Sequence, residues 1–288
     1  MANGQWHLKH GYYGGYRGPS PKDPLHRPGA VFSFEDALKI GVIKTTPGVA
    51  LATAVDFRKQ GWVTTAMEND DQGQLGACVS FSAKHMREFL SIQIGHGLQE
   101  HAPIWLYTKM QEKFEPTELG MDTGAYISWA ASVMSDAGFA LETDWPYDPT
   151  ELGVAPSAMS NFRATWYKNI VSVTVPSDVN AMKQVLSANH AFMLGFNVYN
   201  SFWGAQGSGV IPMPPDGDTL AGGHAVFCFG YQDDKSFAGG GYLWLLNQWA
   251  DFSPENALQM PYAYVTGQDP VNGPWVSDCW SLALAKIS

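Results

Sequence analysis

Apolar residues recur at helical spacing in the first half of the chain. Residues 78–95 place apolar side chains close to the spacing of one helix face, with polar and charged residues between them, which predicts an amphipathic helix. The apolar positions are Phe81, Met86, Phe89, Leu90 and Ile94. Residues 124–138 repeat the pattern with small and aromatic residues on every side, which predicts a second helix in the same lobe. Ser33 as an N-cap, with Asp36 at the third helical position, predicts a shorter helix.

The second half of the chain has a different residue pattern. Four short runs are rich in β-branched and aromatic residues and are separated by Gly, Pro and Asp clusters, which predicts strands. The runs are residues 166–175, 190–199, 223–231 and 241–249. One helix interrupts them, because Pro176 and Ser177 form a capped start for residues 178–190. The chain is therefore predicted to be an α+β protein with a helical lobe over residues 54–162, a β lobe over residues 163–288 and a groove between them.

Residues 1–53 precede this pattern. Residues 1–30 mix Gly, Tyr, Pro and basic residues without helical or alternating periodicity, which indicates an extended arm held by its aromatic side chains. Two placements are open for residues 1–53. They wrap the β lobe, or they occupy the groove as a short self-inhibitory pro-segment.

Charge and cysteine content narrow the choice of partner and compartment. With 17 Lys+Arg against 27 Asp+Glu, the formal net charge is −10, which would repel the phosphate backbone of a nucleic acid. No apolar run is long enough to span a membrane or to form the core of a signal peptide. The 3 cysteines are too few for a disulfide framework. These features predict a soluble cytoplasmic protein with neither nucleic acid nor membrane as a partner.

The sharpest chemical feature is the segment 71–81. Its Gly-rich turn delivers Cys78 to the first turn of a helix, where unpaired backbone N–H groups and the helix dipole favour the reactive thiolate. A lone cysteine at such a place is also commonly a small core residue. Further on, His224 stands at the start of a predicted strand and Asn247 at the end of the next one. Cysteine, histidine and asparagine follow in the order that a thiol acyl-transfer enzyme needs, although a core histidine and a turn asparagine fit the same positions.

In these segments the chain resembles the papain-like (C1) cysteine peptidases, with bacterial and viral members closest in character. Their catalytic segments read Gln-Gly-x-Cys-Gly-[Ser/Ala]-Cys, His-Ala-Val and Asn-Ser-Trp, and two further segments support the match. The matching residues are 72–78, 224–226, 247–249, 142–149 and 259–265. The resemblance covers about residues 54–288 and implies a helical lobe, an antiparallel β-barrel-like lobe and an active-site cleft between them. It also implies a peptidase that acts on polypeptides without a metal or an organic cofactor.

The resemblance implies a role for each of these residues. Cys78 would be the nucleophile and His224 the general base and acid, with Asn247 orienting the imidazole. Gln72 would donate a side-chain N–H to the oxyanion, together with the backbone N–H of the nucleophile. Trp249 would shield the contact between the histidine and the asparagine from water.

The resemblance also implies where a substrate binds. Gly124 would pair with the substrate backbone, and Tyr126 would wall the pocket for the side chain that precedes the cleaved residue. Ala225 would form the base of that pocket and Gly223 would offer a carbonyl oxygen, while Gly76 is a substrate-binding position on the turn before the nucleophile. The pocket predicts an apolar or aromatic preference, unless Tyr126 only packs against the start of its helix.

The sequence departs from the family pattern at several positions. A family disulfide is replaced at both ends, by Leu75 and Met121, which suits a reducing compartment and predicts packing in place of the bridge. Thr123 replaces the first glycine of the substrate-binding pair and would narrow the groove. Val79 and Gln248 stand where the family has Trp and Ser.

Two other classes of function fit the same residues. A thiol acyltransferase or deamidase would form the same acyl-enzyme and differ only in the acceptor. A non-catalytic protein, for example in a virus particle, would keep the fold as a binding or structural module. The sequence has no nucleotide or serine-hydrolase motif, and its histidines lack flanking ligands at metal spacing, so neither a cofactor nor a metal site is expected.

Overall fold

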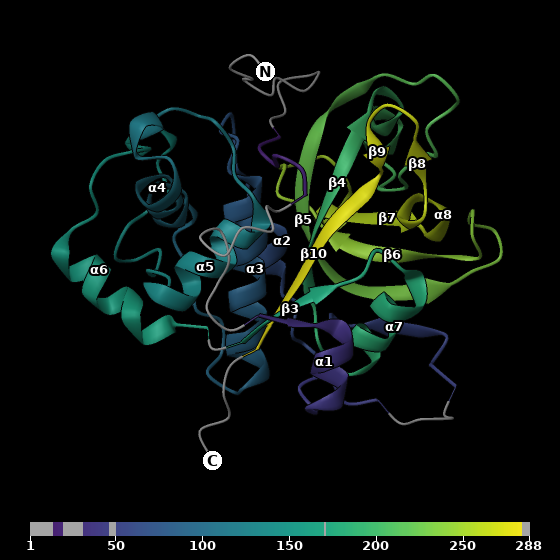
Figure 1. Ribbon diagram of the computed structural model, residues 1–288, viewed down its shortest axis with the longest axis horizontal. Helices are drawn as coiled ribbons and strands as arrows, with labels where there is room; N and C mark the ends of the chain where they lie inside the picture. The colour runs from purple at the N-terminus through teal and green to yellow at the C-terminus, as the bar shows by residue number, and fades with distance from the viewer. Residues whose placement is uncertain (1–13, 20–30, 46–49, 170, 284–288) are drawn as a thin grey trace.

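The computed structural model describes residues 14–19, 31–45, 50–169 and 171–283 of the chain. Helices gather on one side and a curved sheet on the other, as Figure 1 shows. The helical and β lobes predicted from the two halves of the sequence are therefore both present.

The β part is an eight-stranded sheet with long strands at its centre. Its strands are hydrogen-bonded in the order β1-β3-β10-β4-β5-β6-β7, with β2 paired to β5. The bounds are β1 Val31–Ser33, β2 Ala54–Asp56, β3 Val171–Val175, β4 Phe192–Tyr199, β5 Leu220–Asp233, β6 Gly241–Leu246, β7 Ala257–Pro261 and β10 Val276–Ala283. The pair of β1 with β3 is parallel, and the other pairs in this sheet are antiparallel. The short strands β8 Gln268–Asp269 and β9 Gly273–Pro274 pair separately.

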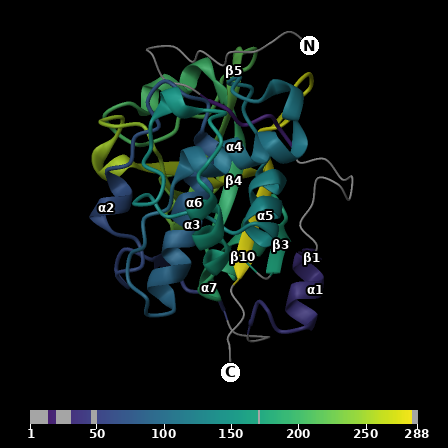
Figure 2. The same cartoon turned by 90° about the vertical axis from the view of Figure 1, so that its left-hand side faces the viewer.

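The helical part is built around α3 (Cys78–Gln93), which lies between β5 and the helices α4 and α5. Seen from the helical side, α3, α4, α5 and α6 lie in front of the strands (Figure 2). The remaining helices of this part are α2 Thr65–Glu68, α4 Pro103–Phe114, α5 Ile127–Asp136 and α6 Ala158–Ala164. Helices α1 Phe34–Lys39, α7 Val179–Ser187 and α8 Tyr262–Val265 pack on the sheet side.

Helix α3 is buried on all sides, so the prediction of an amphipathic helix is wrong here. Every residue from its start to Ser91 is buried, because the helix lies between the sheet and the other helices. Lys84 pairs with Asp70 and Glu88 inside the protein, and His85 bonds to Asp70. Arg87 instead donates to Ser91 Oγ and lies over the ring of Tyr167. Pairing of this kind lowers the free-energy cost of burying charged groups. The polar residues in the sequence therefore do not reveal that the helix is buried.

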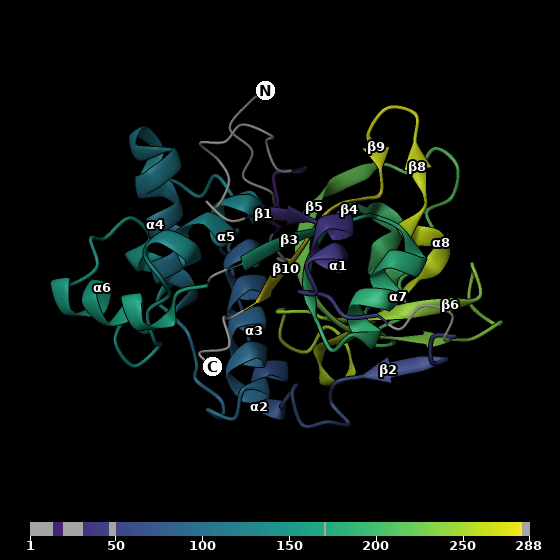
Figure 3. The same ribbon diagram turned by 60° about the horizontal axis from the view of Figure 1, so that its bottom comes forward.

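Residues 31–39 form one edge of the sheet. Strand β1 lies beside β3, and the helix α1 (Phe34–Lys39) follows it directly (Figure 3). The helix begins where its N-cap was predicted, because Ser33 Oγ accepts the backbone N–H of Asp36 at 3.1 Å. The predicted placement of the arm on residues 1–13, 20–30 and 46–49 lies outside the described residues.

Several predicted boundaries shift by a few residues. Strand β3 begins only at Val171, because the 3-10 turn Thr165–Tyr167 occupies the start of the predicted run. Helix α7 is capped by Asp178, whose carboxylate accepts the N–H of Ala181 at 2.8 Å, rather than by Ser177. Among the described residues, none of the helices has the length and the apolar composition that crossing a bilayer requires.

Candidate active site

The candidate nucleophile lies at the start of the central helix. Cys78 is the first residue of α3 and is completely buried. Burial raises the pKa of the Cys78 thiol to about 12, although backbone groups of Ala225, Gly15 and Val79 act in the opposite direction. The burial effect therefore outweighs the helix terminus, and the thiol is protonated at pH 7.

His224 and Asn247 come together from adjacent strands. His224 lies inside β5, which begins at Leu220, and not at the start of the strand as predicted. Asn247 follows the last residue of β6. Because the two strands are antiparallel neighbours, His224 Nε2 comes to lie 2.8 Å from Asn247 Oδ1. The ring of Trp249 stacks on the imidazole, with the ring centroids 4.1 Å apart, and covers this contact.

The imidazole and the thiol are close but not joined. Nδ1 of His224, the ring nitrogen that Asn247 leaves open, has no hydrogen-bond partner among the described residues. Burial lowers the pKa of His224 to about 4, against the opposing effect of Asn247. The sulfur of Cys78 accepts the backbone N–H of Gly15 at 3.2 Å, and it also lies near the backbone of Ala225, the residue after the histidine. The structure therefore brings cysteine, histidine and asparagine into one place.

Gln72 is tied into the base of this site. Its Nε2 donates to the carbonyl oxygen of Leu75 at 2.7 Å, and its Oε1 accepts from Gln248 Nε2 at 3.0 Å. Gln248 Nε2 also donates to the carbonyl oxygen of Ala225 at 2.9 Å, and Tyr147 OH donates to the carbonyl oxygen of Gln72 at 2.7 Å. Sequence reasoning missed both supporting side chains. For Gln248 a signal existed, since this longer amide replaces the serine of the family pattern.

Residues 14–17 lie beside the candidate nucleophile, at the boundary between helices and strands (Figure 1). The N–H of Ala125 donates to the carbonyl oxygen of Gly15 at 2.7 Å, and the N–H of Arg17 donates to the carbonyl oxygen of Ala125 at 3.1 Å. The two segments run parallel. For the arm, the pairing residue is thus Ala125 and not Gly124. Gly124 is needed because its φ is 71° and because a Cβ there would overlap the carbonyl oxygen of Gly15.

The arm also contacts two other predicted substrate-binding glycines. A Cβ at Gly15 would overlap the carbonyl oxygen of Gly76, so the two backbones touch. Tyr16 is 1% exposed and lies against Gly223 of β5 and Gly195 of β4. The predicted substrate positions are therefore occupied by this chain's own segment 14–17.

Tyr126 contacts the arm through Arg17. The Arg17 guanidinium lies 5.0 Å from the ring centroid of Tyr126 and 5.3 Å from that of Trp129, and it forms an ion pair with Glu115. Tyr126 also packs edge-on against Trp129, with centroids 5.0 Å apart. Thr123 Oγ1 donates to Glu115 Oε2 at 3.3 Å, so the residue expected to narrow the groove holds the carboxylate that pairs with the arm.

The two loops that a disulfide joins in the family are joined here by hydrogen bonds. Leu75 is buried, but Met121 is 57% exposed, so the predicted replacement of the bridge by packing is wrong for Met121. Asp122 accepts the backbone N–H of Gly76, at 2.9 Å to one carboxylate oxygen, and the hydroxyl of Tyr107 at 2.8 Å. The Tyr107 hydroxyl in turn accepts the N–H of Gly124 at 2.6 Å. We call Asp122 and Tyr107 the carboxylate–phenol link.

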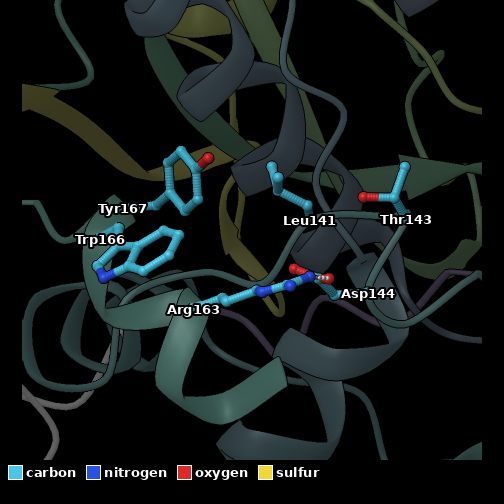
Figure 4. Close-up of a pocket in the computed structure, with 6 residues that line it drawn as sticks. All are labelled: Leu141, Thr143, Asp144, Arg163, Trp166 and Tyr167. Carbon is cyan, nitrogen blue, oxygen red and sulfur yellow. Dashed lines mark hydrogen bonds and ion pairs between the residues drawn. The ribbon is translucent and has the colours of Figure 1, made fainter. Parts of the chain in front are cut away.

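Two surface pockets lie apart from the candidate residues. One, of about 190 Å³, is on the helical side, where Arg163 reaches toward Asp144 while Trp166 and Tyr167 form the opposite wall (Figure 4). The other, of about 690 Å³, lies between α7 and the β5–β6 turn and includes Lys183. Within the described ranges, His, Cys, Asp and Glu side chains form no group of three that could hold a metal ion.

Comparison with known proteins places this site in context. The family model described as "Papain family cysteine protease" matches residues 51–257. An uncharacterised peptidase C1-like protein of Acanthamoeba polyphaga mimivirus is 26% identical over 233 residues, which are 77% of this chain and 73% of the relative.

Solved structures share the architecture. Xylellain, a cysteine protease from Xylella fastidiosa, superposes with a TM-score of 0.73 at 24% identity, over 97% of this chain and 99% of its own. Digestive procathepsin L 3 of Tenebrio molitor larval midgut gives a TM-score of 0.64 at 18% identity, over 83% of this chain and 72% of its own. At these identities the likeness concerns the fold, and it confirms the predicted α+β two-lobe architecture.

Proposed function

The chain belongs to the papain family of cysteine peptidases, and we propose that it hydrolyses peptide bonds through an acyl-enzyme on Cys78. One observation carries the proposal: the imidazole of His224 is held through Nε2 by Asn247 at 2.8 Å. This leaves Nδ1, beside the helix start that presents the thiol, without a partner among the residues that the structure describes. A base that is oriented by a third group and set next to a nucleophile is the arrangement that nucleophilic catalysis requires.

The reaction would then proceed in two stages. His224 Nδ1 takes the thiol proton, and the sulfur of Cys78 attacks the carbonyl carbon of the substrate. The resulting imidazolium returns the proton to the leaving amine, and the acyl group remains on the sulfur. Water, deprotonated by the same imidazole, then attacks the acyl carbon and releases the acid. Asn247 keeps the ring in one orientation throughout, and Trp249 shields the pair from solvent.

Gln72 and the backbone N–H of Cys78 would stabilise the oxyanion of both tetrahedral intermediates. To do so, Gln72 Nε2 must exchange its hydrogen bond with the Leu75 carbonyl oxygen for one with the substrate. Gln248 Nε2 holds the oxygen end of the Gln72 amide. The loss of one oxyanion donor typically costs about 10²–10³ in rate.

The arm would keep the enzyme at rest. Attack requires a carbonyl carbon at the sulfur, but the group that the arm presents there is the N–H of Gly15, so the arm is held in a pose that the thiol does not cleave. Under the arm the pKa of Cys78 is raised to about 12 and that of His224 is lowered to about 4, both by burial, so both groups are neutral at pH 7. We assign residues 1–53 to regulation, residues 54–162 to the lobe with the nucleophile and residues 163–288 to the lobe with its base.

A peptidyl epoxide trap tests this function. The full chain and its Gly15→Ala variant are incubated with the epoxide at pH 7, and the labelled residue is mapped by mass spectrometry. We expect label on Cys78, faster in Gly15→Ala, and none in Cys78→Ala. Pro19→Ala is the matched control, because this arm residue is exposed.

Assays of peptide cleavage and of ammonia release on the same samples separate the outcomes. Ammonia release without chain cleavage would replace the peptidase with a deamidase. A Gly15→Ala variant in which the epoxide leaves Cys78 unlabelled would indicate a non-catalytic protein.

A further inference from the structure

The turn between β6 and β7, residues 247–256, holds its backbone in strained conformations. Four non-glycine residues in the described part of the chain have a positive φ, and three of them lie in this turn. They are Asp251 at 58°, Glu255 at 55° and Asn256 at 50°. Left-handed backbone is costly for a residue with a side chain, although asparagine tolerates it better than most. Strain of this kind persists only where surrounding contacts hold it, so the contacts of the turn indicate what it is for.

Asn256 closes the turn and also binds a second segment. Its carbonyl oxygen accepts the backbone N–H of Asn247 at 2.8 Å. Its side chain is buried, and Nδ2 donates to the carbonyl oxygens of Glu68 at 3.0 Å and Asp70 at 3.3 Å. The two hydrogens of the amide nitrogen thus match two carbonyl acceptors. Aspartate and glycine also suit left-handed backbone, but their side chains could make neither bond.

The bound segment, residues 68–72, leads directly to the candidate oxyanion donor. It is held to the β6–β7 turn at two points. At one end the backbone N–H of Gln72 donates to the carbonyl oxygen of Gln248 at 3.0 Å, and at the other end Asn256 binds the two carbonyls. Two points fix the direction of the segment, whereas one would let it pivot and carry the Gln72 side chain with it.

Asp70 connects the same segment to the helix of the nucleophile. Its carboxylate forms an ion pair with Lys84 and lies 2.8 Å from His85 Nε2, and both partners belong to α3, which begins at Cys78. Asn256 therefore stands where turn, segment and helix are joined. Its side chain bonds to backbone carbonyls and not to a reacting group, so any effect on the reaction would pass through the residues that it positions.

We propose that Asn256 is a positioning residue, which sets the place of Gln72 in the oxyanion site through the two carbonyls that its side chain binds. This inference rests on the proposed function, because Gln72 is an oxyanion donor only if Cys78 is a nucleophile. Loss of the side chain should weaken the oxyanion site and leave the thiol as reactive as before. The bond to the N–H of Asn247 comes from the backbone, so every substitution at this position retains it.

A labelled peptidyl aldehyde tests the proposal. The sulfur of Cys78 bonds to the aldehyde carbon, the C=O double bond becomes a single bond and the thiol proton moves to the imidazole, so the adduct oxygen lies where the oxyanion forms. The corresponding peptidyl alcohol forms no adduct and measures ordinary binding. Both are titrated into the full-length Gly15→Ala chain, with and without a second substitution, and followed by fluorescence anisotropy. Competition with the arm cancels from the ratio of the two affinities.

Two substitutions at Asn256 remove the donor and keep a residue that suits the backbone. Asn256→Gly and Asn256→Asp should each lower the aldehyde-to-alcohol ratio about tenfold, since a displaced donor retains part of the 10²–10³ that a complete loss costs. The affinity for the alcohol and the rate at which iodoacetamide alkylates Cys78 should not change.

The chain offers two matched controls. Asn189→Gly makes the same replacement at an exposed left-handed position after α7, where φ is 63°. Glu255→Gly relieves strain within the β6–β7 turn and leaves the Asn256 side chain in place. Both should keep the ratio of the parent chain. An unchanged ratio in both Asn256 variants, or a parallel fall in alcohol binding or in alkylation, would overturn the proposal, because a parallel fall means a general loosening of the site.

Cleavage assays keep this proposal distinct from the peptidase itself. If the ratio falls as expected and the Gly15→Ala chain cleaves no peptide, the positioning role stands and the peptidase fails. If peptides are cleaved at the same rate with and without the Asn256 side chain, the peptidase stands and the positioning role fails. If no aldehyde adduct forms on Cys78, both fail.

Discussion

Residues 14–17 and residues 31–39 belong to one N-terminal stretch, yet they contact the folded domain in different ways. Strand β1 extends the sheet in register with β3, and α1 buries Phe34 and Ala37 in the core. Residues 14–17 instead lie between glycines and place a backbone N–H on the sulfur of Cys78. Residues 31–39 are therefore packed like any other part of the fold, whereas residues 14–17 lie in the cleft as a bound ligand would.

The difference matters for energetics. Removing a side chain from the sheet edge destabilises the whole domain, because that edge shares the core. If residues 14–17 leave the cleft as we propose, removing a side chain from them should cost no more than the free energy with which they dock, because the rest of the domain would stay folded in that state. Substitutions in the two regions should therefore give different results when the free energy of unfolding and the accessibility of the Cys78 sulfur are measured independently.

The largest effect on stability is expected at the sheet edge. Phe34→Ala should lower the free energy of unfolding by about 3 kcal/mol, because a buried aromatic side chain leaves a cavity in the core. Tyr16→Ala should leave the main unfolding transition nearly unchanged, although Tyr16 is equally buried. Denaturant titration of both variants measures the contrast, and an equal loss of stability would erase the distinction between the two regions.

The largest effect on reactivity is expected in the cleft. Gly15→Ala should raise the rate at which iodoacetamide alkylates Cys78 at pH 7 by about a hundredfold or more. The new methyl group overlaps the Gly76 carbonyl oxygen and expels the arm, so the thiol pKa falls from about 12 and more thiolate forms. Mass spectrometry of the alkylated protein gives the rate for each cysteine. Phe34→Ala, measured under folding conditions, should not show this increase.

The imidazole should report the same opening. With the arm in place, the pKa of His224 is about 4, so the ring should not titrate between pH 5 and 8. Release of the arm hydrates the ring, and its pKa should rise toward the ordinary value of about 6.5. NMR titration of the full chain and of Gly15→Ala compares the two states. An unchanged low pKa in the variant would mean that the arm is not what excludes water.

The smallest effect is expected for the ion pair of the arm. Arg17→Gln should raise the alkylation rate of Cys78 only about threefold, because both partners of the pair are partly exposed and exposed pairs contribute little. Added salt should produce a similar change in the unmodified chain. An increase in alkylation rate as large as that of Gly15→Ala would mean that the ion pair, and not the backbone contacts, is the main anchor of the arm.

The resemblance of the sequence to the papain-like peptidases implies the pairing of His224 with Asn247, and the two side chains are hydrogen-bonded in the structure. It could not predict that Cys78 would bond to Gly15 rather than to the imidazole. That contact depends on glycines that are far apart in the chain and that leave no periodic pattern. The sequence pattern also predicts an amphipathic helix for α3, because the letter of a buried Lys84 is the same as that of an exposed lysine and its partners lie elsewhere in the fold.

The replaced disulfide illustrates a different limit. The family pattern predicts that Leu75 and Met121 replace the bridge as a pair, but the two loops are joined one residue further along each, through Gly76 and Asp122. A backbone N–H carries no side-chain signature, and an aspartate in a loop is common on a protein surface. In the folded chain this carboxylate faces inward, toward Gly76 and Tyr107.

The carboxylate–phenol link has a practical consequence for handling this protein. Enzymes that depend on a thiol are normally kept in a reductant, which in disulfide-linked relatives also attacks the bond beside the nucleophile. Here the corresponding loops are held by Asp122 and Tyr107, and the cysteines of the described chain are all free. Dithiothreitol can therefore be added without breaking the link between the two loops beside Cys78. An acid strong enough to protonate Asp122 should weaken that link.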